Sequence, residues 1–414
     1  MPVAVALGVA AALLLSGALA IAPTPALGGT SPPRLGVSGA TLIEARTGRV
    51  LYGVNADTPL PIASATKLMT ALVTLERVQR LDEMFAAPNY RSAPVDSQIG
   101  LHPGERLSAR DLLLALLLPS ADDAAQDLAY NVGHGSLVRF IEMMNARARE
   151  LGLTHTHYST PIGLDTPGNY SSASDLVRLA GFLRRGQPFF KHAVALPRAV
   201  LRTGDYVRAV SNTNDIVGRV PWVDGVKTGH TLDAGYVLVG SGTKNGITLL
   251  SAVLGTSSAS ARDAATLSLL SYGFANFVLA TPVEAGSVVT RSSVRDRPGA
   301  RVGVIAASTV TRLIRRGTRL STRIQLPGEL AGPLRRQAVV GTLVVLAGGR
   351  PIARVRLLLA DRLAAVSPLA LAARFIIRPS TLVGLALAIG VVLGVTVRRR
   401  GRIREQRREG SQTA

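Results

Sequence analysis

Three short motifs contain the residue types that catalyse acyl transfer. They are Ser64-Ala65-Thr66-Lys67, Ser120-Ala121-Asp122 and Lys227-Thr228-Gly229. Residues three apart share one face of a helix, so the Lys67 amine comes within hydrogen-bond reach of the Ser64 hydroxyl. Such a lysine can act as a base when burial or a nearby positive charge lowers its pKa from the usual ~10.4. We expect Lys227 to supply that charge.

Each motif is common when it stands alone. A Ser-x-x-Lys tetrapeptide occurs by chance in many proteins, usually on an exposed helix face. The order and spacing carry more information, because serine-lysine acyltransferases have this set of three elements in this order. A serine in the first turn of a helix also has its own backbone N–H at the positive end of the helix, where it can stabilise an oxyanion.

Composition limits the other kinds of chemistry. The chain of 414 residues has no cysteine, which excludes a thiolate nucleophile, a disulfide framework and a cysteine metal site. The formal net charge is +21, but aromatic residues make up only 4% of the chain. Basic grooves for single-stranded nucleic acid usually interleave aromatic side chains. We therefore interpret the charge as solvated surface and a membrane-topology signal, with no nucleic-acid partner.

The segments around the motifs predict an antiparallel sheet covered by helices. Strand candidates at 37–44 and 50–54 flank the turn residues 46–49, and a helical pattern follows Ser64. Residues 107–183 are predominantly helical, with separate helices at 112–118, 124–130 and 137–151. Further strands are expected at 223–227, 235–240 and 248–255, before a helix at 259–278. The helical stretch is therefore an all-helical insertion between strands.

The region after this helix predicts a small β domain over residues 282–366. Strand candidates recur at 287–290, 301–305, 322–326, 338–346 and 352–359. Gly348-Gly349-Arg350 has the composition of a hairpin turn between the last two. No catalytic constellation is visible in this domain.

The first 26 residues predict an export signal and leader. Residues 4–21 are apolar, and Ala18-Leu19-Ala20 supplies the small residues that signal peptidases prefer. No Lys or Arg lies near Met1, so either the true start is upstream or the segment stays as an anchor. A buried core helix is the alternative interpretation.

Residues 380–397 predict a transmembrane helix, because they contain no charge. As a helix they are ~27 Å long, close to the roughly 30 Å apolar core of a bilayer. Arg398-Arg399-Arg400 begins a basic tail, 398–414, which should stay on the cytoplasmic side. The sequence therefore predicts a single-pass protein of the cell membrane with an extracytoplasmic catalytic domain. A core helix of a soluble fold is the alternative.

The chain resembles the low-molecular-weight penicillin-binding proteins, the D-alanyl-D-alanine carboxypeptidase family of serine peptidases. The likeness covers about residues 36–280 and continues more faintly to Leu359. Beyond the three motifs, it is carried by segments 48–52, 63–70, 151–154, 161–165 and 223–229. It implies the α/β penicillin-binding transpeptidase or β-lactamase-like fold over residues 34–280, a substrate in the peptidoglycan stem pentapeptide, β-lactam inhibitors and no cofactor.

The resemblance also implies roles in catalysis. Ser64 attacks the carbonyl between two D-alanines, Lys67 accepts its proton, and Ser120 relays a proton towards the leaving D-alanine. The backbone N–H groups of Ser64 and His230 form the oxyanion hole. Water then releases the acyl-enzyme.

The remaining roles implied by the resemblance concern substrate binding. Lys227 supplies positive charge, and Thr228 hydrogen-bonds the terminal carboxylate beside Gly229. Arg262 matches an arginine on the helix after the last core strand, and a guanidinium suits a carboxylate. An ordinary surface arginine is the alternative for Arg262.

One position departs from the family pattern. The middle motif is usually Ser-x-Asn, and this chain has Asp122 at its third position. An ionised aspartate cannot donate the hydrogen bond that an asparagine amide gives to a substrate carbonyl. It also tends to raise the pKa of a neighbouring lysine. Asp122 raises the question of reduced, retuned or lost activity, and a catalytically weak scaffold that grips peptidoglycan is the non-enzyme alternative. We favour catalysis, because Ser64, Lys67, Ser120 and Lys227 are all present.

Two further alternatives involve different chemistry. A class A β-lactamase needs a glutamate that activates the deacylating water, and no Glu-x-x-Leu-Asn stretch lies between Asp122 and Lys227. A zinc D,D-peptidase would need a third ligand and a supporting glutamate motif beside His155 and His157, and none is evident. We expect no metal site.

Overall fold

The computed structural model describes residues 30–93, 95–295, 297–367 and 379–409. The chain divides into two compact units. The first reaches Val278 and includes Arg315–Gly317, and the second comprises Leu279–Ile314 and the chain from Thr318. The predicted export signal lies outside the described residues.

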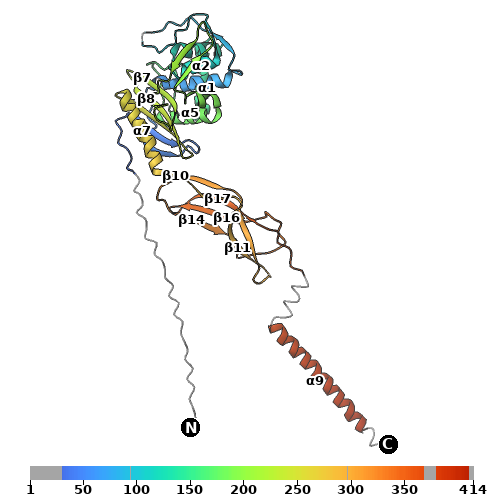
Figure 1. Ribbon diagram of the computed structural model, residues 1–414. Helices are drawn as coiled ribbons and strands as arrows, with labels where there is room; N and C mark the ends of the chain where they lie inside the picture. The colour runs from blue at the N-terminus through green and yellow to red at the C-terminus, as the bar shows by residue number, and fades with distance from the viewer. Residues whose placement is uncertain (1–29, 94, 296, 368–378, 410–414) are drawn as a thin grey trace, which may run out of the picture. The chain divides into compact units, whose positions relative to one another are not determined.

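A five-stranded antiparallel sheet forms the centre of the first unit (Figure 1). Its order is β2-β1-β9-β8-β7, so the strand before Ser64 lies beside strands from the far end of the unit. The strands are β1 (Gly39–Glu44), β2 (Val50–Val54), β7 (Val223–Thr231), β8 (Gly235–Lys244) and β9 (Ile247–Thr256). The turn between β8 and β9 has Asn245 and Gly246 at positive φ, as an Asn-Gly hairpin requires.

Two helices cover the opposite faces of this sheet. Gly181 of α5 (Ala173–Gly186) lies against Leu250, and Gly273 of α7 (Ala259–Asn276) lies against Leu249. Successive residues of a strand point to opposite faces, so these adjacent leucines are buried on different sides. The β9 strand is accordingly almost continuously buried, as expected for a central strand covered twice.

The helical insertion has more elements than the sequence predicted. The three expected helices are α2 (Ala109–Leu117), α3 (Asp122–Val132) and α4 (Leu137–Glu150). The sequence pattern did not mark α5 as a helix separate from the rest of the helical stretch, and it did not predict α6 (Pro188–Ala193). It also missed the short pairs β3 (Met84–Ala86) with β4 (Arg106–Ser108), and β5 (Arg198–Leu201) with β6 (Arg208–Ser211). Strands of three or four residues are too short to show an alternating pattern.

The helix that follows Ser64 runs through the interior of the first unit. This helix, α1 (Lys67–Arg77), is buried on every side from Lys67 to Thr74. Its Leu68, Met69 and Leu72 are fully excluded from solvent and belong to the main hydrophobic core. The 3-10 turn η1 (Ala63–Thr66) joins it end to end, so packing of α1 fixes the position of Ser64.

The second unit is a β domain. A pair of strands, β10 (Phe277–Val283) and β13 (Val310–Arg315), accompanies a six-stranded sheet of order β14-β16-β17-β12-β11-β15. The six strands are β11 (Val288–Val294), β12 (Arg301–Ala306), β14 (Leu320–Gln325), β15 (Glu329–Leu330), β16 (Val339–Ala347) and β17 (Arg350–Leu359). The expected hairpin turn joins β16 to β17, with Gly348 and Gly349 at positive φ.

A single long helix, α9 (Pro379–Glu409), ends the described chain. Its segment Leu382–Ile403 is long and apolar enough to cross a membrane, with a mean hydropathy of 1.9 and none of it buried. The helix continues past Val397 through the arginine cluster, because arginine is a good helix former.

Candidate active site

Ser64 and Lys67 form a direct contact at the junction of η1 and α1. The Lys67 Nζ lies 2.8 Å from Ser64 Oγ, 2.6 Å from Asp122 Oδ1 and 2.8 Å from the Ile162 carbonyl oxygen. These three acceptors match the three N–H groups of an ammonium. Lys67 is completely buried, so water does not compete for them.

Glycine and backbone geometry fix the loop that supplies the Ile162 carbonyl. Gly163 has φ +91°, and a Cβ there would come within 2.2 Å of the Ala63 carbonyl oxygen. Only glycine allows the loop to approach the turn so closely. Ala63 itself has φ +48°, a conformation that costs energy for a residue with a side chain.

Asp122 is held in place from two sides. It is the first residue of α3, its Oδ2 accepts a hydrogen bond from the Ser97 N–H at 3.0 Å, and its own N–H donates to the Ser97 carbonyl. Burial raises the pKa of Asp122, and the positive charge and hydrogen bond of Lys67 oppose this rise. The carboxylate is therefore committed to Lys67 and Ser97.

The two lysines of the motifs have perturbed proton affinities. Burial lowers the pKa of Lys67, while the charge and hydrogen bond of Asp122 act in the opposite direction. Burial also lowers the pKa of Lys227 well below its usual value, and the charges of Lys67 and Arg262 lower it further. Burial is thus the main cause of the lowered pKa of Lys67. The sequence had suggested the charge of Lys227 as this cause.

Ser120 has a hydroxyl without an internal partner. Its side chain is buried, and its Oγ has no hydrogen-bond partner among the described residues. The backbone of Ser120 has φ +68°, which is uncommon for a residue other than glycine and marks a strained position. A buried hydroxyl in this state is available to hydrogen-bond a substrate.

The third motif runs along β7 directly against the Ser64 turn. A Cβ on Gly229 would lie 2.9 Å from Ala63 Cβ and 3.0 Å from the Ser64 backbone nitrogen, so only glycine fits here. Thr228 Oγ1 shares a 2.6 Å hydrogen bond with Thr213 Oγ1, and the Lys227 Nζ donates to the Thr228 carbonyl at 3.1 Å. The strand therefore brings Lys227 and Thr228 next to the nucleophile.

The two outer residues of the predicted site lie at its edges. His230 is exposed and stacks on Tyr236 with ring centroids 4.0 Å apart. Arg262 lies in the first turn of α7 and is almost fully buried. Its Nε donates to Asp263 Oδ1 at 2.9 Å, and one terminal nitrogen lies 2.8 Å from the same oxygen. Arg262 is therefore no ordinary surface arginine.

Sequence reading missed several residues around this cluster. Asn214 is fully buried, and neither polar atom of its side-chain amide has a partner among the described residues. Thr213 and Ser97 also contact the motifs through the hydrogen bonds given above. The polar run 211–214 just before β7 was the available signal, whereas nothing in the sequence marked Ser97.

A cavity of about 470 Å³ opens beside the Ser64 turn. It is lined by Ile62 and Ala63 on one side, and by the 163–170 loop and Asp233 on the others. The cavity adjoins the residues just before Ser64, and Ser64 itself does not line it.

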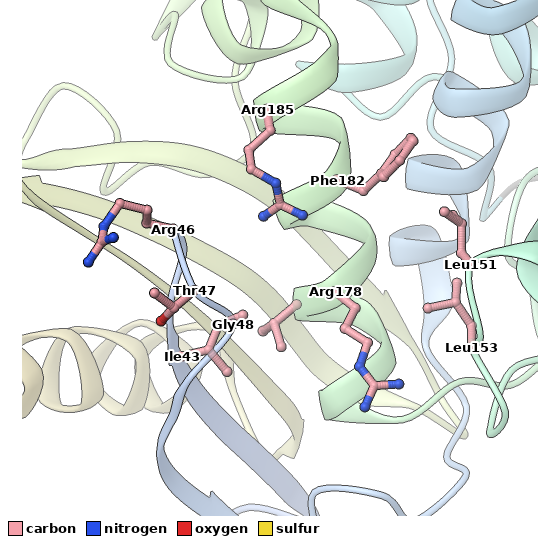
Figure 2. Close-up of a pocket in the computed structure, with 10 residues that line it drawn as sticks. Ile43, Arg46, Thr47, Gly48, Leu151, Leu153, Arg178, Phe182 and Arg185 are labelled. Atoms are coloured by element: carbon pink, nitrogen blue, oxygen red, sulfur yellow. The ribbon is translucent and has the colours of Figure 1, made fainter. Parts of the chain in front are cut away.

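A second pocket, of about 350 Å³, has no lining residue in common with the motifs (Figure 2). Three arginines line it together with Phe182, and each arginine has a partner. Arg46 pairs with Glu44, Arg178 with Asp175, and Arg185 with the Ala45 carbonyl.

The histidine pair has structural contacts. His157 Nδ1 lies 2.6 Å from the Gly168 carbonyl oxygen, and His155 Nδ1 lies 3.3 Å from Thr154 Oγ1. Across the part of the chain that the structure describes, no three His, Cys, Asp or Glu side chains are grouped as a metal site.

Comparison with known proteins gives a consistent family. Residues 28–258 match the sequence profile of the D-alanyl-D-alanine carboxypeptidase family of serine peptidases. The chain is 33% identical to the D-alanyl-D-alanine carboxypeptidase DacC of Escherichia coli over 330 residues, covering 75% of this chain and 80% of the relative. It is 28% identical to DacF of Bacillus subtilis over 321 residues, covering 76% and 82%.

Solved structures similar to this chain belong to the same kind of protein. Penicillin binding protein 5 of Haemophilus influenzae superposes with a TM-score of 0.64 at 29% identity, covering 81% of this chain and all of that one. The Streptomyces K15 DD-transpeptidase superposes with a TM-score of 0.56 at 32% identity, covering 59% of this chain and all of that one. DacD of Francisella tularensis has the same fold, with a TM-score of 0.66 at 23% identity over 85% of this chain and all of that one.

Proposed function

The chain belongs to the D-alanyl-D-alanine carboxypeptidase family of serine peptidases, and from this premise we propose how its own residues perform the reaction and where the enzyme works. It is a serine carboxypeptidase that binds β-lactams. Its substrate is the peptidoglycan stem peptide, from which it removes the terminal D-alanine.

Acylation begins at Ser64. Its Oγ attacks the carbonyl between the two D-alanines, and its proton passes to the neutral amine of Lys67. The new oxyanion accepts hydrogen bonds from the backbone N–H groups of Ser64 and His230. The C–N bond then breaks, Ser120 relays a proton to the leaving amine, and water later hydrolyses the ester. The observation that carries this proposal is the 2.8 Å contact between Ser64 Oγ and a completely buried Lys67 Nζ.

The third motif binds the terminal carboxylate of the substrate. Lys227 and Arg262 provide positive charge beside the site, and Thr228 offers a hydroxyl. Because its pKa is low, Lys227 readily loses its proton in the empty site. A bound carboxylate would stabilise the protonated form of Lys227. Substrate binding therefore forms an ion pair between Lys227 and the carboxylate.

A penicillin adduct tests the nucleophile. Intact-protein mass spectrometry should show one covalent penicilloyl group on the wild type and none on Ser64→Ala. Ser308→Ala, an exposed serine in the β domain, is the matched control and should label fully. A wild-type protein that takes up no label would overturn the enzyme assignment.

The second candidate is a binding scaffold, which the Lys67–Asp122 ion pair favours because the Asp122 charge opposes the lowering of the Lys67 pKa. Measured release of D-alanine from a pentapeptide separates the two. A penicilloyl adduct without D-alanine release would assign the scaffold role, and turnover would exclude it.

We also propose that α9 anchors the enzyme in the cell membrane with the catalytic unit outside the cytoplasm. The chain has no native cysteine, so single cysteines report accessibility cleanly. A membrane-impermeant thiol reagent applied to intact cells should label Val138→Cys, which is 68% exposed, and spare Gly401→Cys. Labelling in the reverse pattern would refute this topology.

A further inference from the structure

One face of the six-stranded sheet in the β domain carries a set of arginines that the catalytic mechanism does not use. Strand pairing places Arg323 of β14 opposite Val344 of β16, and Val344 opposite Arg354 of β17. Cross-strand partners point to the same face. Two residues further along β17, Arg356 therefore lies on this face too, in the row that contains Thr342.

The same face continues across β12 and β11. Leu358 pairs with Ile305, so the odd-numbered residues of β12 share the face of Arg354 and Arg356. Arg301 is therefore on this face, and Arg291 joins it because it pairs with Gly303. We call these five residues the arginine face: Arg291, Arg301, Arg323, Arg354 and Arg356.

The opposite side of the same strands is apolar and buried. The side chains there form the core of the β domain: Val302, Val304, Leu343, Val345, Val355 and Leu357. The strands therefore follow the usual alternation for a sheet with one side towards a core. What needs explanation is that every charge these paired strand segments carry on the outer side is an arginine.

The arginine face is exposed and has almost no opposing charge. All five arginines are exposed, and none has an ion pair or side-chain hydrogen bond among the described residues. The acidic side chain that the described sheet adds to this face is Glu329, on the edge strand β15 opposite Ser293. An ordinary solvated surface mixes both signs of charge. Val344 and Leu346 share this face and are 7% and 8% exposed.

The chain keeps this sheet close to the proposed anchor. Residues 360–378 connect the end of β17 to the start of α9. A tether of this length reaches about 65 Å when fully extended, and less in any other conformation. If α9 spans the bilayer, as proposed above, the arginine face cannot leave the neighbourhood of the lipid surface.

We propose that the arginine face docks on the anionic phospholipid headgroups of the membrane in which α9 is anchored. A guanidinium group can donate two parallel hydrogen bonds to the oxygens of one phosphate. A basic surface near a bilayer is also attracted to anionic lipid. Each arginine near such a surface favours docking by about fivefold, so loss of three lowers the docking equilibrium constant on the order of 100-fold. Docking holds the β domain flat on the bilayer.

Adjacent residues of β14 provide a matched pair of reporters in the full chain. Ser321 and Thr322 are both exposed, but they point to opposite faces of this edge strand, with Ser321 on the arginine face. A fluorophore on Ser321→Cys should be quenched by headgroup-linked quenchers in phosphatidylglycerol nanodiscs. It should not be quenched in phosphatidylcholine nanodiscs or in 0.5 M salt, and a fluorophore on Thr322→Cys should respond weakly in both lipids.

Two charge-matched triple variants test which arginines matter. R323Q/R354Q/R356Q should abolish quenching at Ser321→Cys. R319Q/R335Q/R336Q removes the same charge from exposed arginines in connecting loops and should preserve it. Equal quenching of the two labels, or equal quenching in the two lipids, would overturn the proposal.

A different result would point to another ligand. If soluble polyphosphate binds through the same three arginines while lipid charge has no effect, the face binds an anionic polymer and the lipid proposal is wrong. Failure of the anchor itself is distinguishable, because a chain without a membrane span would leave the nanodiscs in 0.5 M salt, whereas an anchored chain would stay with them.

Discussion

Replacing Asp122 with asparagine should make the enzyme active at lower pH. Acylation needs Lys67 without its proton. In the wild type, burial lowers the Lys67 pKa, while the charge and the 2.6 Å hydrogen bond of Asp122 oppose this effect. The asparagine side chain would carry no charge, so the Lys67 pKa falls further and the neutral amine is populated at lower pH. The acid limb of kcat/KM therefore moves down.

The size of this shift follows from the contact that is lost. A hydrogen bond to a charged group contributes roughly 1.5–3 kcal/mol, and one pKa unit corresponds to about 1.4 kcal/mol. The acid limb should move by about one to two pH units, so kcat/KM below the wild-type limb rises roughly 10- to 100-fold. An asparagine amide can also donate to the substrate carbonyl, which Asp122 in its ionised form cannot do.

The assay is the pH dependence of D-alanine release and of penicillin acylation, measured on Asp122→Asn and on the wild type. Asp127→Asn is a control on the same helix, because Asp127 hydrogen-bonds Asn131 and has no contact with Lys67. The control should leave the acid limb in place.

Two outcomes would refute the reasoning. A limb that stays in place or moves to higher pH would show that Asp122 does not restrain Lys67. Loss of activity at every pH, with an unchanged melting temperature, would make Asp122 itself the acceptor of the Ser64 proton.

Three more substitutions test the surrounding structure. Gly229→Ala places a methyl 2.9 Å from Ala63 Cβ, so penicillin acylation should slow roughly 100-fold in stopped-flow measurements, and an unchanged rate would refute the close approach of β7. Burial raises the Asp127 pKa to about 7, above its unfolded value of 3.8, so stability is lost as pH rises through about 7. Asp127→Asn should therefore raise the free energy of unfolding at pH 8 by about 1–3 kcal/mol, seen as a higher Tm, and leave it unchanged or lower at pH 5. Arg208→Met breaks a buried 2.8 Å ion pair with Glu105 and should cost roughly 3–5 kcal/mol in denaturant unfolding, whereas a loss below about 1 kcal/mol would contradict its structural role.

The sequence predicted local features of the site well. Ser64 and Lys67 are three residues apart, and their contact follows from helical geometry alone. The Asn-Gly turn after β8 and the Gly-Gly turn before β17 were also readable, because each needs residues that accept positive φ.

Longer-range contacts were not readable from spacing. Asp122 and the Ile162 carbonyl lie 55 and 95 residues from Lys67, and a backbone carbonyl leaves no mark in the sequence. Only the family resemblance indicated that the second and third motifs meet Ser64. The short strands β3 to β6 were missed because three or four residues are too few to show an alternating pattern.

The charge of Lys67 shows how burial changes the meaning of a motif. The sequence indicated that Asp122 cannot donate to the substrate carbonyl and tends to raise the Lys67 pKa, and that the positive charge of Lys227 lowers it. In the structure, Lys67 has no solvent exposure, so desolvation already favours the neutral amine before any other charge acts. The same burial raises the Asp122 pKa. Burial therefore acts on both members of the pair in the direction of their neutral forms, while their mutual charge and hydrogen bond act in the opposite direction.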